Sequence, residues 1–532
     1  MYLVTAKEMQ LMDNKTIESF GLPGRILMEN AGRGATQILL DKYPQIYNKK
    51  VGVLAGRGNN GGDGFVMARY LAQQDIRVIV YLLSEKNRIK GDARANLNLL
   101  LPLGVPVVEI HDEPSLLKYK SDMVHTDVWI DAIFGTGLNS DVTGMYKQLI
   151  EFINSRNRYV FSVDIPSGLN ADTGQPCGVC IHAAATATFA FPKIGHILYP
   201  GADYTGFLNV IDIGIPPYIV KEACPMQQLV TKEMIQEKLR PRSHDAHKGD
   251  AGHLFVLAGS AGKTGAAAMT AMSAMRSGAG LVSLGIPTGL NPVLEVLVKE
   301  VMTCPLPENK NGMLDSLSYL NIMDLLAGKK CFAVGPGLGT DFETKYVVCN
   351  VVENSRLPVV IDADGLNCIS GNLQVLKNNH ANIVLTPHPG EMARLAGISV
   401  ENVQKNRISC AKSFAQTCGV HVVLKGARTV VAHPDGKVFI NSSGNSGMAS
   451  GGMGDVLTGI IAGLITQGYS IETAIHAGVY LHGACADYLA ETKGRIGFLA
   501  TDVMDAIPNE IDKLVNGLTN ELMEHRTDNL FF

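Results

Sequence analysis

The feature that most constrains the fold is a repeated unit in the first half of the chain, in which a short apolar run ends in glycine or polar residues. The first run, VGVLAG, covers residues 51–56 and leads into the stretch GRGNNGGDG. Similar runs cover residues 77–83, 128–134 and 159–168. Almost wholly apolar strands are typical of parallel sheets buried on both faces, so the repeats predict an α/β domain. Ligands bind such sheets beyond the carboxyl ends of the strands, where these polar turns should lie.

Two helices are expected before the first strand. Thr5 and Glu8 have the spacing of a capping box at the start of the first helix. Its apolar stripe would consist of Met9, Leu11, Met12 and Ile17. A second helix is expected over residues 25–40, and a third from about Gly62, after the glycine-rich stretch.

A second α/β series follows residues 213–230, which contain prolines and have no clear periodicity. It begins with the strand, small-residue turn and Ala/Met-rich helix of residues 252–287, and apolar runs that end in polar turns continue to residue 429. The sequence therefore predicts two consecutive three-layer α/β domains. The first, Rossmann-like, would cover residues 1–220 and the second residues 228–520.

Composition favours an enzyme that acts on small molecules. The 532 residues include 46 Lys and Arg against 50 Asp and Glu, a balance that indicates neither a nucleic-acid-binding surface nor an acidic solvated segment. The chain opens with no signal segment and its 10 cysteines are scattered, so we expect reduced thiols and a cytoplasmic location. The uncharged run at residues 277–294 is interrupted by glycines and prolines, so no membrane span is expected.

The glycine-rich stretch of the first domain differs from a redox dinucleotide site. Its glycines at residues 56–61 have the GxGxxG spacing, but a Rossmann site also needs an acidic residue about 20 residues later to bind the ribose. Only Glu85 lies just beyond the next strand. The oxygens of Asn59, Asn60 and Asp63 suit a cation or a hydroxyl-rich ligand. From this loop alone, an alternative stays open in which the asparagines only allow left-handed backbone in a tight turn.

Two further strand ends favour a ligand site. Asp131 lies in VWIDAIF and Asp164 in YVFSVDIPSG, so three strands of one sheet should each deliver a carboxylate or carboxamide to the same edge. An isolated acid at an apolar strand end costs several kcal/mol unless it is paired or coordinated. We therefore expect these side chains to converge on one site.

The second domain has its own glycine-rich loop, GNSGMASGGMGD, at residues 444–455, before an apolar helix expected near Gly454. Glycines let backbone N–H groups converge at a helix start, where the helix dipole favours a phosphoryl group. Asp455 could then take a proton from an attacking hydroxyl. The alternative is that Asp455 is an ordinary helix N-cap. The strand exits KGART (residues 425–429) and TPHPGEMAR (residues 386–394), in the same domain, favour the site.

Two other patterns are given a structural interpretation. Cys177 and Cys180 form a CxxC, but no second CxxC follows at zinc spacing. His244, His247 and His253 lie near the start of the second domain, where solvated or backbone-bonded histidines are common. We expect neither group to bind a metal.

Together, the motifs GRGNNGGDG, DAIFGTGL and DIPSGLNADTG, in this order after a helix pair, resemble the NAD(P)HX epimerase domain. The second half resembles the ADP-dependent NAD(P)HX dehydratases, which belong to the ribokinase-like kinases. The fusion is similar to the bifunctional nicotinamide-repair enzymes over nearly the whole chain. The resemblance implies a ribokinase-like fold for the second domain.

The resemblance implies that the first domain interconverts (R)- and (S)-NADHX or NADPHX, which are reduced dinucleotides hydrated at C6 of the nicotinamide ring. Asp164 would be catalytic and contact the reacting end, and we expect it to act as a general acid or base. Asn60, Asp131 and Ser167 would surround a potassium ion. The residues implied to bind the hydrated dinucleotide are Asn59, Asn60, Gly61, Gly62, Asp63, Gly135, Thr136, Gly137, Leu138, Asn139, Ser140, Asp141 and Asp164.

For the second domain, the resemblance implies phosphorylation of the C6 hydroxyl of (S)-NAD(P)HX by ADP, followed by loss of phosphate to give NAD(P)H and AMP. Magnesium would accompany ADP, although no motif fixes its ligands. The residues implied to bind the hydrated dinucleotide are Ala266, Gly337, His388, Pro389, Gly390, Glu391, Met392, Ala393, Arg394 and the catalytic Asp455. Those implied to bind ADP are Lys425, Gly426, Ala427, Arg428, Thr429, Asn445, Ser446, Gly447, Met448, Ala449, Ser450, Gly451, Gly452, Met453 and Gly454.

Two other functions stay open at this point. Hydroxymethylpyrimidine and sugar kinases share the anion site at the helix start, so a small-molecule kinase would release a stable phosphorylated product. Alternatively, the first domain could bind nucleotide without turnover. The expected partners are NADHX or NADPHX and ADP, with no nucleic acid and no membrane, and a homo-oligomer is expected because epimerase domains commonly self-associate.

Overall fold

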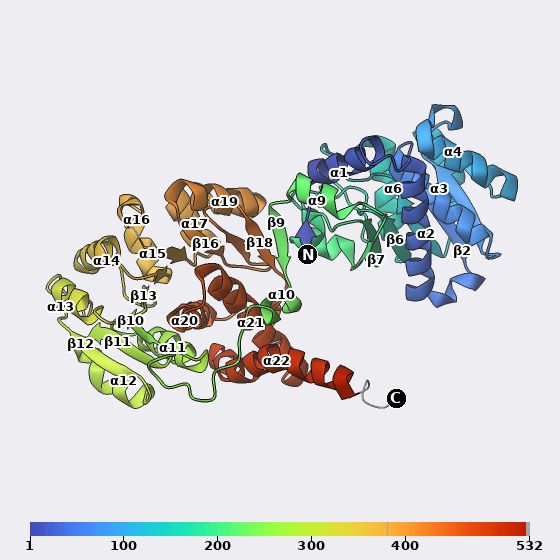
Figure 1. The fold of residues 1–532 in the computed structure, drawn as a ribbon. Helices are drawn as coiled ribbons and strands as arrows, with labels where there is room; N and C mark the ends of the chain where they lie inside the picture. The colour runs from blue at the N-terminus through green and yellow to red at the C-terminus, as the bar shows by residue number, and fades with distance from the viewer. Residues whose placement is uncertain (380, 528–532) are drawn as a thin grey trace. The chain divides into compact units, whose positions relative to one another are not determined.

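The computed structural model describes residues 1–379 and 381–527, which form two compact units (Figure 1). The first unit covers Tyr2–Met226, and the second begins at Gln227. Each is a β-sheet with helices packed on it, which confirms the predicted α/β class.

The sheet of the first unit is parallel, as the apolar runs predict. Its strand order is β4-β3-β2-β5-β6-β7-β8. The strands are β2 (Lys50–Ala55), β3 (Arg77–Leu82), β4 (Val107–Glu109), β5 (Val128–Ala132), β6 (Tyr159–Val163), β7 (Ala185–Phe189) and β8 (Phe207–Ile211). β2, β5 and β6 are therefore neighbours, and the segments that follow them lie at one edge.

Helices cover both faces of this sheet. α2 (Gly24–Lys42), α3 (Asn59–Ala72) and α4 (Gly91–Leu100) share one apolar cluster with the sheet, whereas α5 (Glu113–Met123) and α6 (Gly144–Ser155) share another on the opposite face. Residues that alternate along β2, such as Val53 and Leu54, belong to different clusters. The remaining helices are α1 (Ala6–Glu18), α7 (Ile194–Ile197), α8 (Gly201–Thr205) and α9 (Pro217–Ala223).

The start of the chain agrees only in part with the sequence expectation. The capping box of Thr5 and Glu8 is present at the start of α1, and Met9 and Met12 are buried. Leu11 and Ile17, however, are 43% and 39% exposed, so their assignment to the apolar stripe is wrong. The buried residues of α1 are Met9, Met12 and Thr16, which lie three and four residues apart. They form a narrower stripe on the helix than the one predicted.

α3 begins at Asn59, three residues before the expected start at Gly62. The glycines allow its first turn to pack directly on the end of β2. A Cβ atom on Gly61 would lie 2.0 Å from the carbonyl oxygen of Gly56, well inside van der Waals contact. Asn60 therefore projects from the first turn of a helix, and Asp63 from just after that turn, and neither lies in a free loop.

The sheet of the second unit is mostly parallel, in the order β9-β18-β17-β16-β15-β14-β13-β10-β11-β12. β17 is antiparallel to both of its neighbours. The strands are β9 (Gln227–Val230), β10 (His253–Leu257), β11 (Leu281–Pro287), β12 (Met302–Leu306), β13 (Cys331–Val334), β14 (Val359–Ile361), β15 (Ile383–Leu385), β16 (His421–Leu424), β17 (Val430–Ala432) and β18 (Val438–Asn441).

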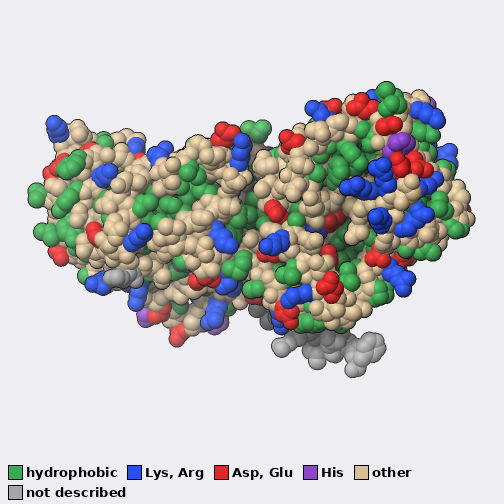
Figure 2. Space-filling view, turned by 90° about the horizontal axis from the view of Figure 1, so that it is seen from above, with side chains coloured by type: hydrophobic (Ala, Val, Ile, Leu, Met, Phe, Trp, Pro, Cys, Tyr) green, Lys and Arg blue, Asp and Glu red, His purple; other side chains and the backbone are tan. Residues whose placement is uncertain are grey.

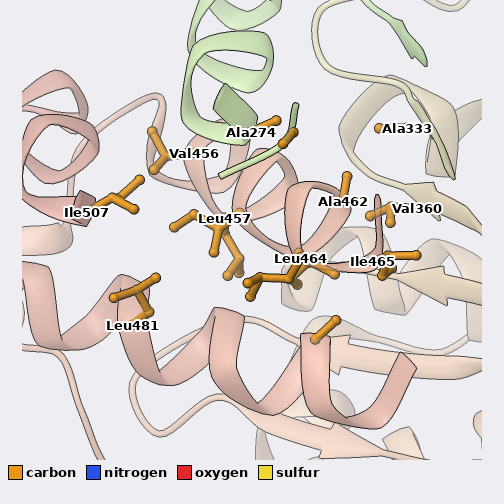
Figure 3. Close-up of a cluster of buried hydrophobic side chains, with 14 of the residues drawn as sticks. Ala274, Ala333, Val360, Val456, Leu457, Ala462, Leu464, Ile465, Leu481 and Ile507 are labelled. Carbon is orange, nitrogen blue, oxygen red and sulfur yellow. The ribbon is translucent and has the colours of Figure 1, made fainter. Parts of the chain in front are cut away.

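The core of this unit is built around α20 (Met453–Thr466), which is buried along most of its length. Figure 3 shows Val456, Leu457 and Ala462 of α20 gathered with side chains of α11 (Thr264–Arg276), α21 (Ile471–Thr492), α22 (Ala500–Thr527), β13 and β14. Gly459 allows the close approach of α11, because a Cβ atom there would lie 2.1 Å from Ser273 Oγ. The start of α20, which carries Asp455, is thereby fixed against the sheet.

Residues that alternate along the strands with those of this core, including Phe255 of β10 and Phe332 of β13, face the other side of the sheet. In Figure 1, helices α14, α15, α17 and α19 lie on that side. The other helices of the unit are α10 (Lys232–Gln236), α12 (Asn291–Leu297), α13 (Ser318–Leu325), α14 (Phe342–Asn354), α15 (Ala363–Ile369), α16 (Gln374–Asn378), α17 (Pro389–Ala396), α18 (Val400–Lys405) and α19 (Arg407–Cys418).

Basic and acidic side chains are interspersed on the face seen in Figure 2, as the near-neutral composition predicts. None of the helices described is long and apolar enough to cross a membrane. All ten cysteines of the chain are free, including Cys177 and Cys180.

Candidate active sites

The ends of β5 and β6 hold a buried hydrogen-bond network around Asp131. The Asp131 carboxylate, fully buried, accepts hydrogen bonds from Ser167 Oγ (2.5 Å), Ser167 N (2.8 Å) and Ser162 Oγ (2.8 Å). Burial raises the pKa of Asp131, and the hydroxyl donors oppose that shift. Phe134 N in turn donates to Ser167 Oγ at 2.9 Å. The network ties the exits of two neighbouring strands together.

Asn60 extends this network to the exit of β2. Its Nδ2 donates to the Phe134 carbonyl at 2.9 Å, while its Oδ1 is buried without a hydrogen-bond partner in the part of the chain described. The three residues predicted around potassium, Asn60, Asp131 and Ser167, are thus brought together. A buried acceptor oxygen left without a donor, on a side chain joined through the Phe134 carbonyl to Ser167, is suited to a cation.

Asp164 lies in a separate network at the end of β6. Its backbone has a φ of +64°, a left-handed conformation that non-glycine residues adopt at some cost. Its Oδ1 accepts from Lys193 Nζ at 2.5 Å and from Thr188 Oγ1 at 3.1 Å. Lys193 is 1% exposed and also donates to Thr188 Oγ1 at 2.8 Å. An ion pair with a buried lysine therefore holds the carboxylate that the sequence predicted to be catalytic.

Two more carboxyl groups lie near this ion pair. Burial raises the pKa of Asp63 well above its usual value, and the charges of Asp164 and Asp13 raise it further. Burial also raises the pKa of Asp13, on α1, to about 6, with Lys193 opposing the shift. Sequence reasoning placed Asp63 in the site but missed Asp13 and Lys193. The only signal for Lys193 was a cation within the apolar run FAFPKIGHI.

The loop after β5 is only partly connected to these networks. Gly135 lies beside Asn60, since a Cβ on the glycine would be 3.5 Å from Asn60 Cβ. The remaining loop residues predicted to bind the dinucleotide run to Asp141, and Gly137 and Asn139–Asp141 are exposed. Among the residues described, no hydrogen bond or ion pair joins these exposed residues to Asp164, and their role in binding stays a prediction.

In the second domain, an ion pair also lies at the carboxyl ends of the strands. Asp362, directly after β14 and 1% exposed, accepts from Lys425 Nζ at 2.5 Å and from Thr458 Oγ1 of α20 at 2.7 Å. Lys425, after β16, also lies 3.9 Å from the Glu391 carboxylate of α17. A Cβ on Gly454 would be 3.1 Å from Lys425 Nζ. The predicted residues Lys425, Glu391 and Gly454 thus converge around Asp362, which sequence reasoning missed.

Asp455 lies in the first turn of α20 and does not cap the helix. The N-cap is Gly452, with a φ of +89°, and it makes no side-chain capping bond. The pKa of Asp455 is raised to about 7, first by burial and then by the charge of Asp362, while Lys425 opposes the shift. The alternative of an ordinary N-cap is therefore wrong, and Asp455 is an acid poised near neutral pH.

Two residues that sequence reasoning missed hold the loops predicted to bind ADP. Arg407 donates to the carbonyls of Leu424 (3.1 Å) and Lys425 (3.3 Å) and so fixes the loop after β16. Asp487 of α21 accepts from Asn445 Nδ2 at 2.9 Å and from Gly444 N at 2.8 Å. Arg407 and Asp487 lie far in sequence from the loops that they contact, so no local motif could have predicted these contacts.

The residues predicted to hold the dinucleotide in this domain come from several segments. Gly337 and Ala266 are neighbours, because a Cβ on Gly337 would be 3.2 Å from Ala266 Cβ. The predicted segment 388–394 covers the N-cap and most of α17, where His388 and Glu391 form a capping box. Arg394 Nε donates to Asn367 Oδ1 at 2.9 Å.

A cavity of about 600 Å³ lies at the opposite edge of this sheet. Its lining includes Lys330, Pro358, Asn382 and His421, each at the start of a strand or directly before one. None of the predicted site residues lines it. In residues 1–379 and 381–527, no group of three or more His, Cys, Asp or Glu side chains is arranged to hold a metal ion.

Comparison with known proteins identifies the chain. Residues 24–195 match the family model described as YjeF-related protein N-terminus, and residues 254–509 match the model described as NAD(P)H-hydrate dehydratase. The bifunctional NAD(P)H-hydrate repair enzyme Nnr of Moorella thermoacetica is 41% identical over 509 residues, which cover 96% of each chain. The chain belongs to the family of bifunctional NAD(P)H-hydrate repair enzymes.

Other members of this family are similarly related. The enzyme of the same name from Escherichia coli is 36% identical over 94% of this chain and 92% of its own length. Among solved structures, an ADP/ATP-dependent NAD(P)H-hydrate dehydratase from Bacillus subtilis, co-crystallised with ATP and Mg²⁺, is 31% identical with a TM-score of 0.48. It covers 54% of this chain and 98% of its own.

Replacing Lys193 by Met should lower the free energy of unfolding of the first domain by about 3 kcal/mol, because the partly buried Asp164 carboxylate would lose its cation. Trp129, the only tryptophan of the sequence, is buried in β5, so its fluorescence follows the unfolding of this domain in urea. The matched control is Lys147→Met, which removes an exposed ion pair with Glu151 and should change the free energy by less than about 0.5 kcal/mol. Equal losses in both variants would contradict a stabilising role for the buried pair.

Proposed function

We propose that the first domain interconverts (R)- and (S)-NAD(P)HX and that the second converts the (S) epimer to NAD(P)H, with ADP as phosphoryl donor and AMP and phosphate as by-products. The observation that carries the proposal is the pairing, in each domain, of a lysine-held carboxylate with a nearby carboxyl group of raised pKa. Such groups can transfer protons at neutral pH. The assignment of the individual binding residues is part of this proposal.

In the first domain, Asp164 would face the reacting carbon. C6 of the hydrated ring carries both a hydroxyl group and the ring nitrogen, so it can invert when one of these bonds opens and closes again. Whichever bond opens, the enzyme must give one proton to the substrate and take one from it. Lys193 Nζ, 2.5 Å from Asp164 Oδ1, fixes the position of the carboxylate that would exchange the proton.

We propose that Asn60, Asp131 and Ser167 hold a potassium ion. The unpaired, buried Oδ1 of Asn60 supports this assignment, and the Phe134 carbonyl is close enough to the group to contribute. When bound, the ion would supply positive charge beside the buried Asp131 carboxylate. The residues themselves fix the loops after β2, β5 and β6 relative to one another.

In the second domain, Asp455 would take the proton from the C6 hydroxyl, whose oxygen then attacks the terminal phosphoryl group of ADP and releases AMP. Lys425 and the backbone N–H groups at the start of α20 would bind the phosphoryl oxygens. Phosphate then leaves C6 and a proton leaves C5, which restores the ring double bond. We propose that Mg²⁺ enters with ADP, held mainly by phosphate oxygens and water.

We further propose a cytoplasmic location and a homo-oligomer. Ten free cysteines agree with a reducing compartment. The oligomeric state stays a prediction from the resemblance to self-associating epimerase domains.

A mixture of NADHX epimers incubated with ADP tests both activities at once. The wild-type chain should restore the full nicotinamide absorbance, whereas Asp164→Asn should restore rapidly only the share of the (S) epimer. Asp455→Asn should lower the repair rate at least about 100-fold while the epimers still interconvert, because only the phosphoryl transfer loses its base. Wild-type repair by Asp455→Asn would refute the base assignment, and a stable phosphorylated product would favour a simple kinase.

The dehydration rate should depend on the ionisation of Asp455. Because a base acts in its deprotonated form and the pKa of Asp455 is about 7, the rate at low concentrations of (S)-NADHX should fall tenfold per pH unit below that value and level off above it. Asp362→Asn removes a negative charge that raises this pKa, so its profile should shift to lower pH. Identical pH–rate profiles for the wild type and Asp362→Asn would show that Asp455 does not control the fall of the rate at low pH.

A further inference from the structure

The first active site contains a carboxyl group whose chemical role the proposed function leaves open, that of Asp63. It is the fifth residue of α3, directly after the first turn, and is 8% exposed. Within residues 1–379 and 381–527, its side chain forms no hydrogen bond or ion pair, and only burial and nearby charges act on it. A buried, unpaired carboxyl group is far more stable as the neutral acid, which can donate a proton.

The charged groups around Asp63 agree with a neutral acid. Asp164, at the end of β6, and Asp13, on α1, bring negative charge toward it. Lys193 is the cation that acts on Asp63, but its Nζ lies 2.5 Å from Asp164 Oδ1. His196, on α7, adds no positive charge at neutral pH, because burial and Lys193 lower its pKa to about 3. The ammonium group of Lys193 is therefore paired with Asp164 and not with Asp63.

These two environments separate the roles of the carboxyl groups. Asp164 accepts hydrogen bonds from Lys193 Nζ and Thr188 Oγ1, so its carboxylate is held in place as an acceptor. Asp63, buried without a partner, is favoured as the acid. A carboxyl group without a partner beside a carboxylate paired with a lysine can form a general acid–base pair.

We propose that Asp63 is the proton donor of the epimerase and that Lys193 positions Asp164 as its proton acceptor; this rests on the proposed epimerase function. Asp63 gives its proton to the C6 hydroxyl, the C6–O bond breaks, and water leaves with the electron pair while the nitrogen lone pair forms the C6=N1 bond. Water then adds to the opposite face of C6 and gives a proton to Asp164. Return of that proton to Asp63 completes the cycle, so atoms and charge balance.

Asp63→Asn in the full-length chain tests the proposal, with the two NADHX epimers separated and followed over time. The amide keeps the size of the side chain but cannot donate the proton, so kcat for epimerisation should fall at least about 100-fold with little change in KM. An unchanged kcat with a raised KM would overturn the proposal, since Asp63 would then only bind the substrate.

The pH dependence of the wild-type chain gives a second test that needs no variant. Loss of the Asp63 proton should lower the epimerisation rate at alkaline pH, and the residual activity of Asp63→Asn should lack this fall. A wild-type rate that stays level or rises throughout the alkaline range would overturn the proposal.

Two controls separate this proposal from the wider assignment. Asp41→Asn, an exposed carboxylate on α2 of the same domain, should epimerise like the wild type. The fluorescence of the buried Trp129 in Asp63→Asn should match that of the wild type, which shows that the first domain is folded. Dehydration of pure (S)-NADHX with ADP by this variant should also be unchanged, because the second domain is not altered. If the wild-type chain does not interconvert the epimers, the proposed function fails, whereas equal rates for wild type and Asp63→Asn reject only the role of Asp63.

Discussion

Both sites depend on one electrostatic constraint, a carboxylate at the end of a parallel strand that is largely shielded from water, fully in the case of Asp362 and partly in that of Asp164. Desolvation makes such a charge costly unless a cation lies against it. The structure meets this requirement in the same way in each domain, with Asp164 on Lys193 and Asp362 on Lys425, both at 2.5 Å. The lysine is committed to one carboxylate, so burial and negative charge raise the pKa of the neighbouring Asp63 and Asp455.

The fold supplies the positions that this chemistry needs. Parallel strands bring β2, β5 and β6, and likewise β14 and β16, to a common edge, so residues distant in sequence meet there. A helix that begins with glycines, α3 or α20, then packs its first turn close to the strand ends. Asp455 lies in the first turn of α20 and Asp63 directly after the first turn of α3, and a helix start also offers backbone N–H groups to a ligand.

The sequence predicted the elements whose patterns are local, but not the contacts that join them. Apolar runs and glycine-rich turns predicted the strands, the parallel sheet of the first domain and the start of α20, and the motifs placed Asp164 and Asp455 at strand and helix ends. Lys193, Asp362 and Arg407 were missed, because each acts on a residue that only the folded chain brings near. The start of α3 was misplaced because glycine and asparagine usually indicate a turn, whereas here packing against β2 continues the helix through them.

The most direct test of this account is the protonation state of the aspartates themselves. Infrared difference spectra in the carboxyl region, recorded at pH 6 for the wild-type chain, Asp63→Asn and Asp455→Asn, report which groups carry a proton. The account predicts a protonated-carboxyl band in the wild type that loses intensity in each variant. Spectra without such a band, or a band that is the same in all three proteins, would show that both groups are ionised and contradict the account.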